Sequence, residues 1–347
     1  MSSIYPNLNW KKFFLKEKNS NDIKVILHNA IYFNSARSAL LGYLKSEKIK
    51  KGDKVLLPSF MCESIILPIN KIGCEIEFYD VDDNFLPLID KISDDIKILF
   101  LLNFFSLLDE KSLLPKVKMP RDIKIIYDFA HSMPMPGIVS YKCDAIIYSL
   151  YKCLPLFDGG VLISKKKIFL KLNKQKLFVT LKKIIKKIIN YTDNILPISV
   201  INILLNFKTI YAFVYRKNIL KFDEAFQISK ISLYYLKKFS FNEEYLIRKK
   251  NYTLLLRLFE KNKPEWIERV YELHENSSPI FFPILVKNKS VCEDIIYKMR
   301  KMNISPGIFW PKPSIVNVES KLYDRIIVLP IHGTFETNKI IQKMKFL

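Results

Sequence analysis

Short apolar runs, each bounded by polar or turn-forming residues, recur through the first half of the chain. Runs of this length and composition are typical of buried strands in a mainly parallel sheet that helices cover on both faces. A helical pattern at residues 38–45 precedes them. The first half is therefore predicted to be an α/β domain. The runs lie at residues 54–60, 74–81, 97–105, 123–130, 144–150 and 160–164.

The rest of the chain has a different pattern. Lys-rich segments of helical spacing predict helices at 181–190 (LKKIIKKIIN) and 222–239. The first of these could pack on the protein core, which is the commoner arrangement, or contact an anionic membrane surface. Further strand and helix patterns follow in a smaller α+β region at the C-terminus, at residues 279–286, 290–305 and 325–331. We expect a large domain over 1–245, with a basic helical insert at about 165–220, and a small domain over 246–347 that shares an interface with it.

Composition indicates a folded cytoplasmic protein. The 347 residues are 49% hydrophobic, enough for a large core. Five cysteines are an odd number without zinc-site spacing, which favours reduced thiols and predicts no metal. The N-terminus has no apolar segment of the signal-peptide kind, and the most apolar run, 98–108, is too short to span a bilayer.

A formal charge of +22 raises the question of nucleic-acid binding. The lysines are scattered, however, and no RNA-binding or helix-turn-helix signature is found among them. Abundant Lys, Ile and Asn also follow from AT-rich coding. We therefore expect no nucleic-acid partner, and interpret the charge as a solvated surface or as attraction for an acidic substrate.

One lysine stands apart from the rest. Lys152 lies in an otherwise uncharged stretch, SLYKCLPLF, directly after a predicted buried strand. A partly desolvated lysine on a tight loop is suited to Schiff-base formation. Asp128 ends the preceding strand, and ligands of parallel sheets collect at this carboxyl edge, so the two residues are expected in one crevice. A carboxylate there could hold a pyridinium nitrogen protonated, although a strand-end aspartate is more often a simple cap.

Hydroxyl groups and a helix start could bind a phosphate nearby. The segment NSARSAL supplies Ser35 and Ser38 at the beginning of a predicted helix, and Ser149 lies three residues before Lys152. Each signal alone is weak, because a Ser-x-x-Lys pattern is more often a surface accident. Their order along the chain is more specific than any one of them.

The ordered motifs NSARSALLGYL, KKGDKVLLPSFMCES, GCEIEFYDVD, IIYDFAHS and DAIIYSLYKCLPLFDGGVLIS resemble the DegT/DnrJ/StrS-type sugar aminotransferases, pyridoxal-phosphate (PLP) enzymes of fold type I. The resemblance continues into MNISPGIFWPKP and IIVLPIH and leaves out only about 165–220. It implies PLP as cofactor, Lys152 as Schiff-base lysine and proton carrier, Asp128 on the pyridine nitrogen and His131 beside the cofactor. The residues it implies around the phosphate and ring are Ala36, Arg37, Ser38, Ser149 and Cys62.

The chain departs from this family at three places. Cys62 stands where many relatives have an aromatic ring stacked on the cofactor, and Ala36-Arg37 replaces a Gly-Thr pair. The segment LKFDEAF (220–226) replaces an Asn and an Arg of a loop that, in the family, reaches the neighbouring subunit of a dimer. A homodimer with active sites at its interface is still implied, with this contact altered.

The resemblance implies transfer of an amino group from an amino acid, usually glutamate, to a keto group of a nucleotide-linked sugar, for surface polysaccharide or aminosugar synthesis. Three alternatives stay open: dehydration of a sugar with the same cofactor, a substrate other than a nucleotide sugar, and an inactive protein that contacts membranes through 181–190. The retained Lys152 argues against dehydration, because relatives that dehydrate have a histidine at this position.

Overall fold

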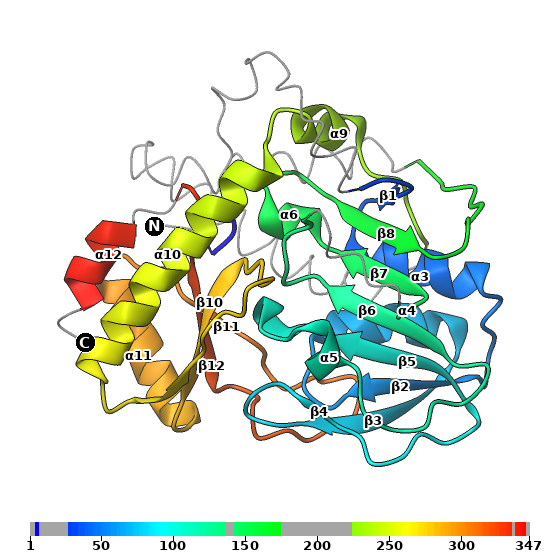
Figure 1. Ribbon diagram of the computed structural model, residues 1–347, viewed down its shortest axis with the longest axis horizontal. Helices are drawn as coiled ribbons and strands as arrows, with labels where there is room; N and C mark the ends of the chain where they lie inside the picture. Colours follow the sequence, from blue (N-terminus) through cyan, green and yellow to red (C-terminus); the bar gives the residue numbers. More distant parts are fainter. Residues whose placement is uncertain (1–3, 7–26, 136–141, 175–223, 335–336, 345–347) are drawn as a thin grey trace.

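The computed structural model describes residues 4–6, 27–135, 142–174, 224–334 and 337–344 (Figure 1). The described residues form a large sheet and a smaller sheet, each with its own helices. The expected helix at 181–190 and most of the basic insert lie outside the described residues.

Eight strands form the large sheet in the described part of the chain, in the order β1-β8-β7-β6-β5-β2-β3-β4. Their bounds are β1 (Ile31–Phe33), β2 (Lys54–Pro58), β3 (Glu75–Val81), β4 (Pro87–Leu88), β5 (Ile96–Leu102), β6 (Lys124–Phe129), β7 (Ala145–Tyr148) and β8 (Gly160–Ser164). The run β7-β6-β5-β2-β3 is parallel, whereas β8, β1 and β4 pair antiparallel. The prediction of a mainly parallel sheet is therefore confirmed.

Helices cover the large sheet on both faces. In Figure 1, α3 and α4 lie behind the sheet, and α5 and α6 lie on the nearer side. The helical elements of this part are α3 (Ala36–Ser46), η1 (Glu63–Ile65), α4 (Ile66–Ile72), η2 (Phe104–Ser106), α5 (Glu110–Leu113), α6 (Leu150–Cys153) and α9 (Lys230–Leu236). Almost every residue of β5, β6 and β7 is buried, as continuous apolar runs require.

The small sheet is antiparallel, with the order β11-β12-β10-β9. It confirms the smaller α+β domain expected at the C-terminus. Its elements are α10 (Phe241–Asn262), β9 (Ile267–Val270), β10 (Phe281–Val286), α11 (Lys289–Lys301), β11 (Gly307–Ile308), β12 (Ile326–Pro330) and α12 (Thr337–Met344). The long helix α10 runs across the expected domain boundary at 245/246 and packs beside β9 and β10 of the small sheet (Figure 1).

One predicted helix was partly wrong. The helical spacing of 222–239 predicted one continuous helix, but α9 covers only Lys230–Leu236. Upstream of it, Phe226 and Gln227 form β-bridges with Asn173 and Phe33. The helix begins where Ser229 caps it, because the Ser229 hydroxyl accepts a hydrogen bond from the Ser232 amide.

Within the described residues, no helix has the length and apolarity needed to cross a bilayer. The run at 98–108 forms a buried strand followed by the short helix η2.

Candidate functional site

Two neighbouring parallel strands bring three of the predicted site residues to one edge of the large sheet. Asp128 is the penultimate residue of β6 and pairs with Ile147 of β7. His131 follows β6 by two residues, and Lys152 lies in α6, the short helix that begins just after β7. Because both strands end at the same edge, residues 24 positions apart in the sequence share one site.

Asp128 is a buried carboxylate, with 5% of its surface exposed. One of its oxygens accepts a hydrogen bond of 2.7 Å from the backbone N–H of Ala130. Burial raises the pKa of Asp128 to about 6, although this hydrogen bond and the positive charge of Lys152 both act to lower it. Asp128 is therefore mainly ionised at neutral pH and protonated in moderately acidic solution.

His131 is buried among aromatic rings. Its imidazole stacks on Phe105, Phe309 and Trp310, with centroid distances of 5.1, 5.3 and 5.0 Å, and Phe281 meets it edge-on. Burial, followed by the charge of Lys152, lowers the pKa of His131 well below 6.5, so the ring is neutral at pH 7. Its Nδ1 atom is buried without a hydrogen-bond partner among the described residues.

Lys152 is half-buried, and its charge acts on both Asp128 and His131. Such an effect on two buried groups requires that its ammonium group lie near both. Among the described residues, no hydrogen bond or ion pair engages this amino group. The amino group of Lys152, a buried carboxylate and a neutral imidazole are therefore grouped at this edge of the sheet.

The loop before α3 packs against the segment that follows Lys152. The Gly159 amide donates to the Asn34 carbonyl at 3.2 Å. A Cβ atom on Gly160 would lie only 2.1 Å from the carbonyl carbon of Ser35, so the two backbones touch. Ser35 caps α3, and Ser38 donates from its hydroxyl to the Asn34 side chain at 2.6 Å. The hydroxyls and helix N-terminus proposed for phosphate binding are thus held beside the Lys152 segment.

Ser149 lies close to this contact in the chain, at the start of α6. It is buried, and its hydroxyl has no hydrogen-bond partner among the described residues. The next residue, Leu150, lies 3.2 Å from the position that a Cβ on Gly159 would occupy. Ser149 Oγ and His131 Nδ1 are thus two of the buried polar atoms that lack partners in the described part of the chain. A buried polar atom without a partner is costly, so both are suited to bind a polar ligand.

The remaining predicted residues lie at element starts. Ala36 and Arg37 are half-buried at the beginning of α3. Cys62 is half-buried in the loop after β2, and its sulfur lies 3.1 Å from the hydroxyl of Ser64. Tyr323 of the small domain holds this loop, donating to the Ser59 carbonyl at 2.7 Å and accepting from the Met61 amide at 3.3 Å.

Sequence reasoning missed the residues that surround His131 and the lysine-bearing helix. Phe105, Trp310 and Arg248 are all buried next to the site, and each comes from a different part of the chain. The only available signal was the position of Trp310 within the motif MNISPGIFWPKP. Arg248 is one of 56 basic residues, and no sequence signal singles it out.

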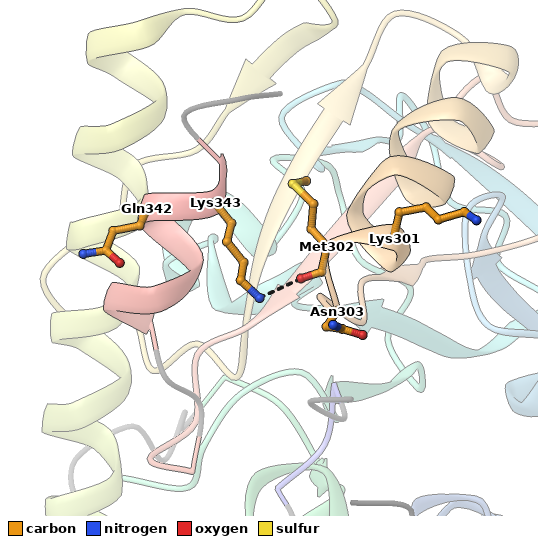
Figure 2. A pocket seen from close by; sticks show the side chains of 5 residues that line it. All are labelled: Lys301, Met302, Asn303, Gln342 and Lys343. Carbon is orange, nitrogen blue, oxygen red and sulfur yellow. Dashed lines mark hydrogen bonds between the residues drawn. The ribbon is translucent and has the colours of Figure 1, made fainter. Parts of the chain in front are cut away.

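A separate hollow lies on the outside of the small domain, at the end of α11 and on α12 (Figure 2). Its lining residues are Lys301, Met302, Asn303, Gln342 and Lys343. Most of these side chains are exposed, and Lys343 donates to the Met302 carbonyl at 2.9 Å (Figure 2). None of the predicted site residues lines this hollow.

Comparison with known proteins gives a fold-level match. No family model matches the sequence, and no curated protein matches it. Among solved structures, the apo form of the putative sugar aminotransferase Spr1654 from Streptococcus pneumoniae aligns with a TM-score of 0.64 and 14% identity, over 99% of this chain and 96% of that one. The same protein has also been solved in PLP and PMP forms.

Two further structures match as well. The aminotransferase TlmJ from Streptoalloteichus hindustanus gives a TM-score of 0.64 at 13% identity, over 93% of this chain and 88% of that one. A DegT DnrJ EryC1 StrS aminotransferase from Brucella abortus gives 0.58 at 17% identity, over 91% and 85%. The chain has the fold of these aminotransferases. The predicted fold class, PLP-transferase fold type I, is therefore confirmed, and the chemistry is argued from the site itself.

Proposed function

We propose that the protein is a PLP-dependent aminotransferase that moves an amino group from an amino acid, with glutamate as the expected donor, to a keto group of a nucleotide-linked sugar. The observation that carries the proposal is the meeting of Lys152, Asp128 and His131 at the carboxyl edge of the sheet, with the charge of Lys152 acting on the other two. The fold shared with structures in PLP and PMP forms supports it.

The residues present fit this cofactor. Ser38 and the first backbone amides of α3 could bind the phosphate group, together with the unpartnered hydroxyl of Ser149. Ala36 and Arg37 lie in the same helix start. The unpartnered Nδ1 of His131 would gain a polar contact. Two buried atoms without partners would thus be satisfied by one ligand.

When bound, PLP supplies an aldehyde that takes up amino groups and a ring that withdraws electrons from the neighbouring carbon. Asp128, ionised at neutral pH, would hold a proton on the ring nitrogen. Lys152 would bond the aldehyde through Nζ and afterwards accept and return a proton at the reacting carbon. His131, neutral and fixed by its aromatic neighbours, would orient the ring without adding charge.

Several features support an anionic substrate of the nucleotide-sugar kind. The net charge of +22 attracts diphosphates, and the structural neighbours include sugar aminotransferases. A GDP-4-keto-6-deoxymannose-3-dehydratase shares the fold too, with a TM-score of 0.64 at 14% identity. Lys152 favours transamination over dehydration. We also propose that the protein is located in the cytoplasm and forms a homodimer. Light scattering coupled to size-exclusion chromatography measures the oligomeric state.

Trapping the cofactor on its lysine tests the proposal. Purified protein is incubated with PLP, treated with borohydride, digested and analysed by mass spectrometry. We expect a reduced cofactor adduct on Lys152, a visible absorbance band before reduction, and loss of both in Lys152→Ala. Lys166→Ala, at an exposed lysine after β8, is the matched control and keeps both. Persistence of the band in Lys152→Ala, or an adduct confined to other lysines, contradicts the assignment.

A second experiment identifies the substrate class. The protein is first converted with glutamate to its amino form and then incubated with a panel of keto-sugar nucleotides and the corresponding free keto sugars. Amination of a nucleotide-linked sugar supports the proposal, as detected by a mass increase of about 1 Da when a keto oxygen is replaced by an amino group and a hydrogen. Loss of water from the sugar without amination favours dehydration, and reaction with free sugars alone favours a different substrate.

A further inference from the structure

Arg248 is a completely buried cation, with 0% of its surface exposed. It lies in α10, outside the predicted site residues. A buried guanidinium is costly unless its donors are all engaged. Here Nε donates to Glu244 Oε1 at 2.9 Å, Nη1 to the Ile280 carbonyl at 2.8 Å, and Nη2 to the Cys153 carbonyl at 2.6 Å.

The contact with Cys153 bears on Lys152. Cys153 is the last residue of α6, which has only four residues and therefore little stability of its own. Carbonyls at a helix C-terminus have no partner within the helix, and a cation placed there is stabilising. The guanidinium thus fixes the end of the turn that carries Lys152.

The contact with Ile280 reaches the other side of the site. Ile280 directly precedes β10, and the first residue of that strand, Phe281, meets the His131 ring edge-on at 5.7 Å. Glu244, the partner of Arg248, also accepts a hydrogen bond of 3.1 Å from the Gly333 amide through the same Oε1 atom. One side chain therefore links the lysine-bearing turn to the small-domain strand that packs on His131.

We propose that Arg248 is a positioning residue of the candidate active site. Its planar guanidinium group holds the carbonyls of Cys153 and Ile280 at a fixed separation. This contact keeps the amino group of Lys152 directed toward Asp128 and His131. Lysine cannot reproduce the arrangement, because a single ammonium lacks the rigid set of donors that reaches two carbonyls and a carboxylate. The catalytic consequence rests on the proposed function, whereas the effect on the turn does not.

The first test uses the cofactor-free protein. Hydrogen exchange is measured at the Leu154 amide, which donates to the Leu150 carbonyl at 2.8 Å and so reports on α6. In Arg248→Lys we expect exchange of this amide to be at least tenfold faster, with exchange in the core strand β5 unchanged. Arg257→Met, at an exposed arginine of the same helix, is the matched control. Unaltered exchange at Leu154 in Arg248→Lys overturns the proposal.

The second test separates positioning from general loss of stability. With PLP added, Arg248→Lys should keep its cofactor dissociation constant within a few-fold, and the KM for glutamate should change little. The rate constant of the glutamate half-reaction should fall about tenfold to a hundredfold, because a small displacement of a catalytic group has effects of this size. A rate constant equal to wild type, or one that falls only in proportion to the unfolded fraction, overturns the positioning role.

The two proposals fail differently. If wild-type protein forms no adduct at Lys152, the proposed function fails, and hydrogen exchange in the cofactor-free protein still decides whether Arg248 holds the turn. If the adduct forms and Arg248→Lys behaves as wild type, only the role of Arg248 is lost. Glu244→Gln keeps the acceptor oxygen and serves as the milder variant should Arg248→Lys fold poorly. In Glu244→Gln, exchange of the Leu154 amide should be faster than in wild type, but by less than tenfold. An unchanged exchange rate in this variant counts against the proposal.

Discussion

The imidazole of His131 lies against the indole of Trp310, with ring centroids 5.0 Å apart and planes inclined by 27°. His131 follows strand β6 of the large sheet, whereas Trp310 follows β11 of the small sheet. The two domains therefore meet at the candidate active site through stacked rings. A change in the packing of the small domain therefore alters the surroundings of His131, which lies beside Lys152.

This contact predicts a large effect of removing the indole. Trp310 is buried, and Trp310→Ala leaves a cavity between the domains, for which we expect a loss of about 3–5 kcal/mol in the free energy of unfolding. Trp310→Phe keeps a ring and should cost clearly less. Urea unfolding measures both. Trp266→Ala is the comparison, because Trp266 is only half-buried and should cost less. Equal losses at the two positions contradict the interpretation.

Asp128→Asn is predicted to stabilise the cofactor-free protein at neutral pH. The folded-state pKa of Asp128 is about 6 against an ordinary value of 3.8, so its contribution to stability falls as pH rises from about 3.8 through 6. At 1.36 kcal/mol per pH unit, this difference is worth about 3 kcal/mol at pH 7.5. Asparagine removes the charge and can still accept from the Ala130 amide.

Urea unfolding of the cofactor-free protein at pH 7.5 measures this gain, and titration with PLP measures its functional cost. We expect Asp128→Asn to gain stability and to bind PLP more weakly, since the partner of the ring nitrogen is lost. Asp122→Asn, at an exposed carboxylate just before β6, should change neither quantity by much. A loss of stability in Asp128→Asn would show that the carboxylate is not penalised by burial.

The positions of Asp128 and Lys152 could be foreseen because burial and parallel pairing leave a strong local signal. Strands buried on both faces must be continuously apolar, so β5, β6 and β7 stand out in the sequence. Once β6 and β7 are taken as parallel neighbours, their ends must share an edge. The shared position of Asp128 and Lys152 at this edge then follows from the pattern without any long-range information.

Other features depend on contacts between distant segments and have no comparable signal. Residues 224–229 have helical spacing, but pairing of Gln227 with Phe33 and capping at Ser229 override it. Phe105 reaches His131 from a turn in which its own φ is +54°, a conformation that side-chain pattern does not reveal. Arg248 donates hydrogen bonds to the carbonyls of Ile280 and Cys153, which lie 32 and 95 positions away in the sequence.

His131 makes the cofactor-free protein sensitive to acid. Its pKa is held well below 6.5 in the folded state, so the unfolded chain binds a proton below pH 6.5 that the folded state does not, and stability falls as pH decreases. Between pH 7.5 and 5.5 this contribution amounts to about 1.4 kcal/mol. His131→Phe keeps a ring among the aromatic neighbours and removes the titrating group.

Urea unfolding at pH 7.5 and pH 5.5 is the measurement. We expect the stability of wild type to change unfavourably by about 1.4 kcal/mol relative to that of His131→Phe over this interval. The opposite trend of Asp128 is present in both proteins and cancels in the comparison. An identical loss in the two proteins would mean that His131 titrates normally in the folded state.

Gly160→Ala is predicted to disrupt the proposed phosphate site. A Cβ at this position would lie 2.1 Å from the carbonyl carbon of Ser35 and 2.4 Å from the amide nitrogen of Ala36, and neither backbone atom can turn away as a side chain could. The loop before α3 must therefore move. We expect a loss of about 2–3 kcal/mol in the free energy of unfolding and at least tenfold weaker PLP binding. We expect a matched control, Gly52→Ala, to separate the steric clash from backbone strain.

The φ of Gly52 is +85°, which is unfavourable for alanine, but nothing lies within 4 Å of the added carbon. Gly52→Ala should cost about 1 kcal/mol through strain alone and leave PLP affinity unchanged. Urea unfolding and spectroscopic titration with PLP separate the two variants, and unchanged affinity in Gly160→Ala would show that the start of α3 does not bind the phosphate.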